Sequence, residues 1–310
     1  MVIDSKRDIY QSITESIIAA IEAGAGTCVM PWHRKADAGM PRNPVTRNPY
    51  RGVNTLILWM TAQQRGYASS YWASYLQWRS IGAQVREGER GTTIVFYKRM
   101  DECPDQDAVG EQKGRARMLL RYSYVFNADQ VDGRKPDGAV LVVGQEPFAE
   151  VEAFLNALDS DVQYGSDIAA YSPTHDRIFM PNRVEFYDTP SGSGVENIYA
   201  VLLHEHVHWT GHKSRLARDF SGKFGSESYA MEELVAELGA AFLCATLGIS
   251  TFPRPDHAAY LASWLKVLKG EKTAIFTAAS AATKACEYLK EIAEKNKQTE
   301  PVHVFNQNPA

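Results

Sequence analysis

The chain has 310 residues, of which 45% are hydrophobic and 23% charged, and its formal net charge is -4. This length predicts two domains, and the composition excludes collagen-like, coiled-coil and wholly disordered chains. The longest apolar run, residues 236–249, is shorter than the roughly 20 residues that a membrane-spanning helix needs.

The opening residues and the cysteines bear on where the protein is expected to reside. The opening residues MVIDSKRDIY contain no apolar core typical of a signal peptide, and no membrane partner is expected. The four cysteines are widely spaced and form no CxxC pair, which argues against a disulfide framework or a cysteine zinc site. Together these features predict a cytoplasmic protein with reduced thiols.

The net charge averages two opposite halves. Residues 1–127 carry 17 Lys and Arg against 12 Asp and Glu, whereas residues 128–310 carry 16 against 25. Within the first half, residues 28–99 hold 11 basic and 3 acidic residues and four of the six tryptophans. This asymmetry indicates a local partner preference that the whole-chain value hides.

The elements expected in the first half alternate between helices and strands. Isoleucines at helical spacing predict a helix over residues 9–21, and a second helix begins at Asn54 and ends before Gly66. The proline-rich segment between them predicts a long loop, and a third helix capped by Ser70 is expected to stop at Gly82. Two β-rich runs, residues 92–99 and 117–127, predict a hairpin with a long acidic tip.

A polar stretch rich in glycine and proline follows the hairpin. We therefore expect a first domain over residues 1–127, a linker over 128–146 and a second domain over 147–310. Both domains are expected to be of the α+β class.

The first half combines the residue types that bind single-stranded nucleic acid, namely cationic side chains for phosphates and aromatic faces for bases. The sequence shows no helix-turn-helix or zinc-finger spacing for reading a duplex. The competing interpretation is that the tryptophans form a core and the arginines are simply solvated. The predicted contacts to single-stranded DNA are Trp32, His33, Arg34, Arg42, Asn43, Arg47, Tyr50, Arg51, Asn54, Trp72, Gln77, Trp78, Arg79, Gln84, Arg86 and Lys98.

The second half contains the strongest motif of the chain, HExxH at residues 204–208. On a helix, His204 and His208 lie about one turn apart on one face and can bind one metal ion. Glu205 is then placed to act as the catalytic acid and base, taking a proton from water and passing it to a leaving amine. A strand expected over residues 174–181 is a candidate for pairing with an extended peptide.

A catalytic zinc site needs a third protein ligand, and the strongly helical residues 229–249 supply candidates. We expect Glu233 to be the ligand and Glu237, one turn further on, to support a ligand histidine. Glu232 and Glu237 remain alternative ligands. Ser214 stands where a third histidine of an HExxHxxGxxH motif would fall. The expected cofactor is Zn²⁺, with Mn²⁺ as the alternative.

The chain resembles ArdC-type antirestriction proteins over nearly its whole length. The segments PWHRKA, RNPYRGVN and SSYWASYLQWRSIGAQVREGERGTTIVFYKR are similar to the N-terminal domain of that family, and MPNRVEF, YAVLLHEHVHWTGHKSRLAR and EELVAELGAAFLC to its zincin-type metallopeptidase domain. The resemblance implies a single-stranded-DNA-binding domain followed by a gluzincin-like domain with His204, His208 and Glu233 as ligands. It further implies protection of plasmid DNA from host restriction during conjugation.

Two other functions stay open at this point. The chain could be a metalloprotease whose basic first domain recruits a protein substrate, with host restriction-modification subunits as a target. It could also be a DNA-binding protein with an inert metal domain, because an intact HExxH does not by itself establish hydrolysis.

Overall fold

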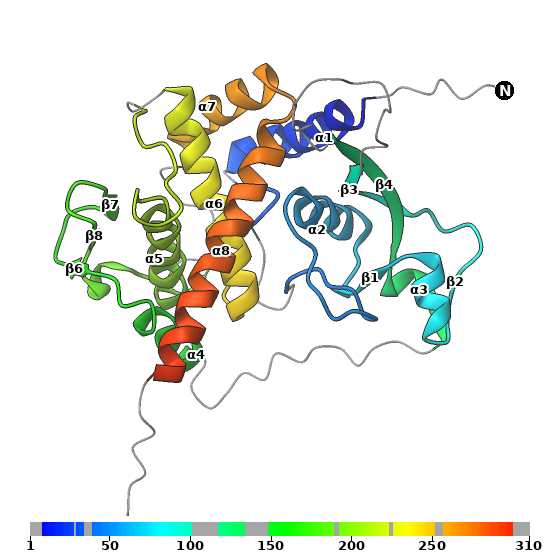
Figure 1. Cartoon of the computed structure of the whole chain (residues 1–310), viewed down its shortest axis with the longest axis horizontal. Coiled ribbons are helices and arrows are strands. Elements are labelled where there is room, and N and C mark those ends of the chain that lie inside the picture. Colours follow the sequence, from blue (N-terminus) through cyan, green and yellow to red (C-terminus); the bar gives the residue numbers. More distant parts are fainter. Residues whose placement is uncertain are drawn as a thin grey trace, which may run out of the picture. The chain divides into compact units, whose positions relative to one another are not determined.

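The computed structural model describes residues 8–27, 29–33, 39–100, 117–133, 148–188, 192–222, 226–251 and 257–299. Packing divides the chain into two compact units that interleave along the sequence (Figure 1). We call them the helical unit, comprising Met1–Met40, Arg51–Leu56 and Ala139–Ala310, and the ribbon unit, comprising Pro41–Tyr50 and Ile57–Gly138.

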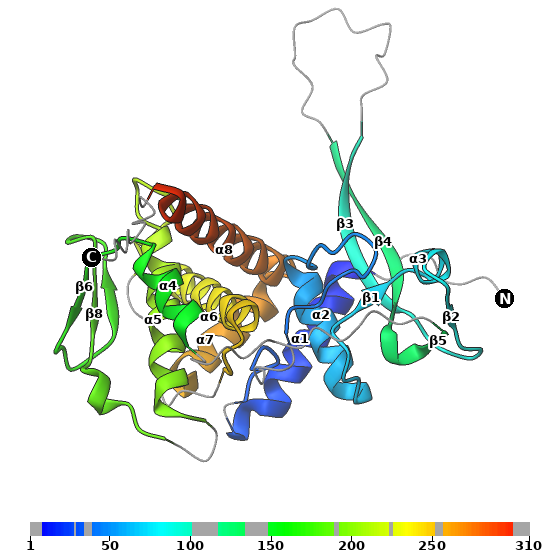
Figure 2. The same ribbon diagram turned by 90° about the horizontal axis from the view of Figure 1, so that it is seen from below.

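The ribbon unit is built on a long, twisted pair of antiparallel strands, β3 (Thr92–Met100) and β4 (Arg117–Asn127) (Figure 2). Their register runs from Thr92 opposite Val125 to Met100 opposite Arg117, which confirms the hairpin expected from the sequence. The short strand β1 (Trp72–Ala73) pairs with the end of β4. A second, two-stranded sheet joins β2 (Ala83–Val85) to β5 (Val131–Gly133), with the 3-10 turn Ala128–Gln130 between β4 and β5.

Two helices complete this unit. Helix α2 (Val53–Arg65) begins and ends close to the expected positions, and its residues from Ile57 onward belong to the ribbon unit. Helix α3 (Tyr75–Ser80) starts later than expected, since Trp72–Ala73 are drawn into the sheet. Ser74 then caps the helix in a reciprocal capping box with Gln77, in place of the predicted Ser70.

The tryptophans of the ribbon unit form its core. Trp72 packs with Leu58 and Val125, and Trp78 belongs to a second cluster of buried residues around Val131. The indole N–H of Trp78 donates to the carbonyl of Phe126 at 2.9 Å. Burial of apolar surface and this hydrogen bond tie α3 to the base of β4.

The helical unit contains α1 (Ile9–Gly24) with the 3-10 turn Ala25–Thr27, α4 (Ala149–Asn156), α5 (Gly194–Thr210), α6 (Glu227–Leu247), α7 (His257–Gly270) and α8 (Ala274–Thr299). Helices α5, α6 and α8 pack against one another. Among the described residues, no helix has the length and apolar content needed to cross a membrane.

Helix α1 packs within the helical unit although it precedes the ribbon unit in sequence. Asp8 caps this helix and is ion-paired with Lys272, while the hydroxyl of Thr14 donates to the Lys272 carbonyl at 2.7 Å. The packed units are therefore discontinuous along the chain. The boundaries expected from the sequence, residues 1–127, 128–146 and 147–310, stay a prediction.

A small mixed sheet lies beside α5 in the order β6 (Val162–Tyr164), β8 (Arg177–Met180), β7 (Ala170–Ser172), followed by the 3-10 turn Arg183–Glu185. Strand β8 pairs on both sides, in parallel with β6 and antiparallel with β7. The strand expected over residues 174–181 is therefore central, and the expectation that it offers a free edge is wrong. The neighbouring strand β7 is an edge strand instead.

Candidate metal centre

Helix α5 carries the HExxH motif and is well defined at its start. Ser193 caps it in a reciprocal capping box with Glu196. His204 and His208 lie one turn apart and are both buried, at 2% and 7% exposure. Their Nε2 atoms approach within 3.2 Å of each other, so both imidazoles converge on one point.

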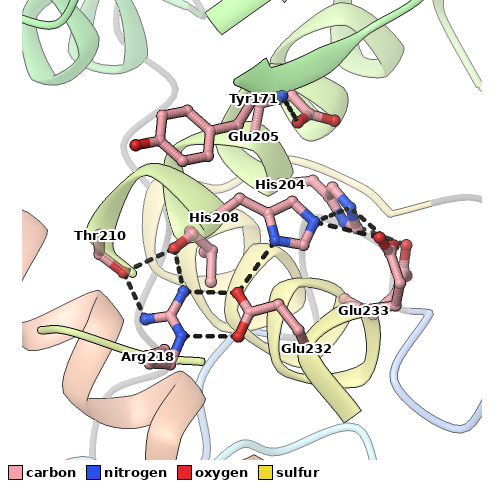
Figure 3. Close-up of polar contacts among 10 residues, drawn as sticks. Tyr171, His204, Glu205, His208, Thr210, Arg218, Glu232 and Glu233 are labelled. Atoms are coloured by element: carbon pink, nitrogen blue, oxygen red, sulfur yellow. Dashed lines mark hydrogen bonds and ion pairs between the residues drawn. The ribbon is translucent and has the colours of Figure 1, made fainter. Parts of the chain in front are cut away.

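Helix α6 brings a carboxylate to that point. Ser226 caps this helix through the Tyr229 N–H, and Glu233 lies in its second turn. One carboxylate oxygen of Glu233 lies 3.6 Å from His204 Nε2 and the other 3.6 Å from His208 Nε2 (Figure 3). The structure thus brings together the three residues expected as ligands.

The three groups fit a divalent cation. Ligand atoms at zinc-ligand bond lengths in a tetrahedral site lie about 3.3 Å apart, close to the 3.2 and 3.6 Å found here. His204 Nδ1 faces Glu237 at 3.2 Å and His208 Nδ1 faces Glu232 at 3.1 Å. Because each Nδ1 faces a carboxylate, the Nε2 atom of each ring is the one turned toward the shared point, where it can bind a cation.

The carboxylates that surround the two histidines favour a positive charge in this pocket. Burial lowers the pKa of His208, but hydrogen bonds with Glu232 and Glu233 outweigh burial and raise it to about 10. Burial raises the pKa of Glu233, yet hydrogen bonds with the two histidines hold it well below its usual range. The described residues therefore form a metal site from His204, His208 and Glu233.

Two further carboxylates orient the ligand histidines. Glu237 lies where the sequence analysis places it, against His204 Nδ1. Glu232, which the sequence analysis kept as an alternative ligand, contacts His208 Nδ1 instead. Burial raises the pKa of Glu232, and hydrogen bonds with His208 and Arg218 more than compensate, so its pKa is lowered.

Arg218 is a residue of this site that sequence reasoning missed. Its guanidinium donates to both oxygens of Glu232, at 2.9 and 2.8 Å. It also donates to the Val207 carbonyl at 2.6 Å and to the Thr210 hydroxyl at 2.8 Å (Figure 3). One side chain thereby ties the loop after α5 to both metal-bearing helices. The only sequence signal was an arginine soon after HExxH, with nothing to link it to Glu232.

Glu205 lies on the side of the pocket nearest strand β7. The backbone N–H of Tyr171 donates to a carboxylate oxygen of Glu205 at 2.7 Å (Figure 3). Glu205 is 5% exposed and lines a cavity of about 290 Å³ with the three ligands. The cavity is also lined by Ala170, Tyr171, Phe220, Tyr229 and Tyr260.

The turn between β7 and β8 is fixed to the end of α5. Arg215 is ion-paired with Asp176, and its guanidinium lies 3.9 Å from the ring centre of Trp209. The Tyr171 hydroxyl donates to Asp176 at 2.8 Å. Hydrogen bonding to Arg215 lowers the pKa of Asp176 to about 2. These contacts hold the strand whose backbone meets Glu205.

The other histidines described take no part in the metal site. His206 is buried between the Leu202 carbonyl at 2.7 Å and the Ser160 hydroxyl at 2.8 Å, and burial lowers its pKa to about 4. His175 is exposed and hydrogen-bonded to Ser172. Both serve local packing or surface contacts.

The residues predicted to contact DNA divide into buried and exposed groups. Trp32, Trp72 and Trp78 are 1%, 1% and 0% exposed, which is at odds with a stacking role because no ring face is open. Trp32 lies in the helical unit, edge-on to Trp264.

Several predicted polar contacts are engaged within the fold. Asn43 donates to Gln77 at 3.1 Å, and the Tyr50 hydroxyl donates to the Trp72 carbonyl at 2.8 Å. His33 accepts from the Met30 N–H at 3.0 Å. Gln84 donates to the Tyr75 hydroxyl at 3.0 Å.

The basic residues of the set differ in their surroundings. Arg47 and Arg79 are exposed, whereas Arg86 is ion-paired with Glu89 at 2.7 Å. Arg51 is exposed but paired with Glu287 within the helical unit. Arg42 and Asn54 are half-buried. Arg34 and the side chain of Lys98 lie outside the described part of the chain.

Comparison with known proteins gives two family matches. Residues 149–281 match the zincin-like metallopeptidase family, and residues 7–126 match the N-terminal domain of anti-restriction factor ArdC. The crystal structure of antirestriction ArdC protein from the R388 plasmid is similar in its metal-free form, with 40% identity and a TM-score of 0.75 over 93% of this chain and 98% of that one. Its Mn(II)-bound form is similar with 39% identity and a TM-score of 0.74, over 92% and 98%.

Two curated relatives differ greatly in length. Protein y4eC of Sinorhizobium fredii (strain NBRC 101917 / NGR234), described as uncharacterized, is 44% identical over 290 residues, which is 91% of each chain. A DNA primase TraC of Escherichia coli is 34% identical over 309 residues, which is 95% of this chain but 21% of the primase. The chain therefore spans about a fifth of that primase.

Proposed function

The chain belongs to the ArdC family of antirestriction proteins, with a metallopeptidase-like domain, and we propose that it binds single-stranded DNA entering a recipient cell during plasmid conjugation and protects it from host restriction. The positive charge of the ribbon unit is the observation that supports the proposed DNA binding. The described residues of the ribbon unit, 41–50, 57–100 and 117–133, hold ten Lys and Arg against four Asp and Glu. A cationic surface of this kind suits a polyanion.

The metal centre supports a second activity, hydrolysis of a peptide bond. Zn²⁺ is the metal we propose, since two imidazoles and one carboxylate suit it, and Mn²⁺ is the alternative because the R388 relative is described as Mn(II)-bound. The bound cation would act as a Lewis acid toward the scissile carbonyl. A host restriction-modification subunit is the protein target we propose.

The chain's own residues divide the remaining work. Glu205 takes a proton from the attacking water and delivers it to the leaving amine. The N–H of Tyr171 holds the Glu205 carboxylate in place. The edge strand β7 offers its backbone to an extended substrate, and Glu237 and Glu232 fix the ring orientation of His204 and His208.

DNA binding is tested with the full-length protein, because α1 packs with the helical unit and a fragment ending near residue 130 would lose its partners. We expect the logarithm of the binding constant for single strands to fall linearly with the logarithm of the salt concentration. Each phosphate contact should add about 0.7 to the steepness of that slope. Absence of salt-sensitive binding would contradict the proposal.

Peptidase chemistry is tested with Glu205→Gln, which removes the proton acceptor and leaves the three ligands intact. We expect unchanged metal affinity and a loss of hydrolysis of at least about 100-fold, the usual contribution of general acid-base catalysis. The assay is cleavage of purified restriction-modification subunits by the metal-loaded protein. If this variant still protects incoming DNA, protection depends on DNA binding alone, and the peptidase serves another purpose.

A further inference from the structure

Strand β4 carries two tyrosines whose side chains are open to solvent. Tyr122 and Tyr124 are each 53% exposed, whereas the tryptophans of the same unit are buried. The two tyrosines are two residues apart, so they lie on one face of the strand. Their rings meet edge to face with centroids 5.8 Å apart. Adjacent exposed rings on a strand indicate a surface that a partner covers.

The ribbon keeps these rings uncovered. Thr93 lies opposite Tyr124 and Val95 opposite Tyr122, so both cross-strand neighbours are small. Gly91 lies beside Tyr124, and a Cβ atom there would come within 3.0 Å of the Tyr124 Cβ. A side chain at position 91 would therefore crowd the base of the Tyr124 side chain and the ring of Phe126, which lies 3.2 Å from that Cβ position.

The same two strands carry basic residues and no acidic ones. Their 20 residues include no acidic residue and four basic ones, which are Lys98, Arg99, Arg117 and Arg121. Arg121 precedes Tyr122 directly and is exposed, and its side chain extends from the opposite face of β4. Positive charge and open aromatic faces on the same strands are the combination that binds a single strand, since phosphates need cations and unpaired bases need a ring on which to stack.

We propose that Tyr122 and Tyr124 form the platform on which bases of single-stranded DNA stack. This inference rests on the proposed function, and it moves the stacking surface from the buried tryptophans to the β3–β4 ribbon. A duplex keeps its base faces inside the stack, so the platform selects single strands.

The test measures binding of dye-labelled oligo-dT by fluorescence anisotropy over a salt series, using the full-length protein. Tyr122→Ala/Tyr124→Ala should weaken binding by at least about tenfold with an unchanged salt slope, because stacking releases no counterions. Tyr122→Phe/Tyr124→Phe should stay within about twofold of the parent, since the rings remain.

Two controls make the result specific. Tyr187→Ala removes a tyrosine that is 73% exposed in the helical unit, and it should leave binding unchanged. An abasic oligonucleotide of equal length should bind the parent and the double alanine variant equally, since it offers nothing to stack.

The outcomes distinguish failure of the base-stacking platform from failure of the proposed function. If the parent protein binds oligo-dT and the alanine variant, with unchanged thermal unfolding, binds it equally well, the platform is wrong and the proposed function stands. An equal loss on duplex or abasic DNA would also overturn stacking on bases. If the parent does not bind oligo-dT at all, the proposed function itself fails.

Discussion

At the scale of single residues, the metal site depends on contacts that hold the ligands in one orientation. Arg218 and Glu232 form a paired group behind His208, and Glu237 stands behind His204. All three carboxylates that reach the histidines, those of Glu232, Glu233 and Glu237, come from consecutive turns of α6. The precision of the site therefore comes from α6 and from the loop that Arg218 anchors.

Glu232→Gln should weaken metal binding by about 10- to 100-fold, the usual effect of removing a carboxylate that orients a ligand histidine. Arg218→Gln should do the same by releasing Glu232. The measurement is competition with a chelator, followed by calorimetry. Arg177→Gln is the control, because Arg177 pairs with Asp161 on the small sheet, and it should bind metal like the parent. Parent-like affinity in both Glu232 and Arg218 variants would contradict the orienting role.

The metal ligands could be predicted from the sequence because helical spacing fixes His204 against His208, and because α6 carries few other candidates. Arg218 and Glu232 could not, since their contacts depend on how a loop folds back over two helices. Likewise, the sequence gives no sign of which aromatics are exposed. Trp78 and Tyr122 are both aromatic residues in a basic segment, yet only the fold buries one and exposes the other.

At the scale of elements, the close approach of α5 and α6 sets the distance between the histidines and Glu233. Gly239 on α6 faces Val207 on α5, and a Cβ atom at position 239 would lie 2.7 Å from Val207 Cγ2. Only glycine permits this spacing without displacing a helix.

Gly239→Ala should therefore destabilise the fold by about 1–3 kcal/mol through overpacking, despite the better helix propensity of alanine. It should also weaken metal binding by moving α6 away from α5. Val207→Ala added to this variant should restore part of both losses. Gly270→Ala is the matched control, since nothing lies within 4 Å of its Cβ position. Chemical unfolding is the measurement, and a stability gain in Gly239→Ala would contradict the packing argument.

The ion pair between Asp176 and Arg215 holds the turn between β7 and β8 in position. Its Asp176 has a pKa lowered from 3.8 to about 2, chiefly by the hydrogen bond with Arg215. Such a group stabilises the fold above its unfolded-state pKa, and this contribution is lost as the pH falls toward 2.

Asp176→Asn should lower the free energy of unfolding at neutral pH by about 1 kcal/mol or less, because Asp176 is partly exposed. The difference from the parent should shrink as the pH falls from about 4 to 2. Asp167→Asn, at an exposed position between β6 and β7, should behave like the parent at every pH. A gap that stays constant down to the lowest pH would show that Asp176 acts through packing alone.

At the scale of the whole molecule, the net charge of -4 conceals a cationic ribbon unit and an acidic remainder. The sequence predicted this asymmetry and the α+β class correctly, because both depend on composition and local periodicity. It did not predict that α1 packs with the helical unit, since such a long-range choice leaves no local signal. A cationic unit inserted between parts of a metallopeptidase-like unit suits the two activities that we propose.

The most direct test of this account is the frequency of plasmid transfer into recipient cells with and without a restriction system. We predict that donors lacking this protein transfer normally to the non-restricting recipient and poorly to the restricting one, and that the parent protein corrects the defect. The Tyr122→Ala/Tyr124→Ala variant should correct it less well. Equal transfer to both recipients in the absence of the protein would contradict the central claim.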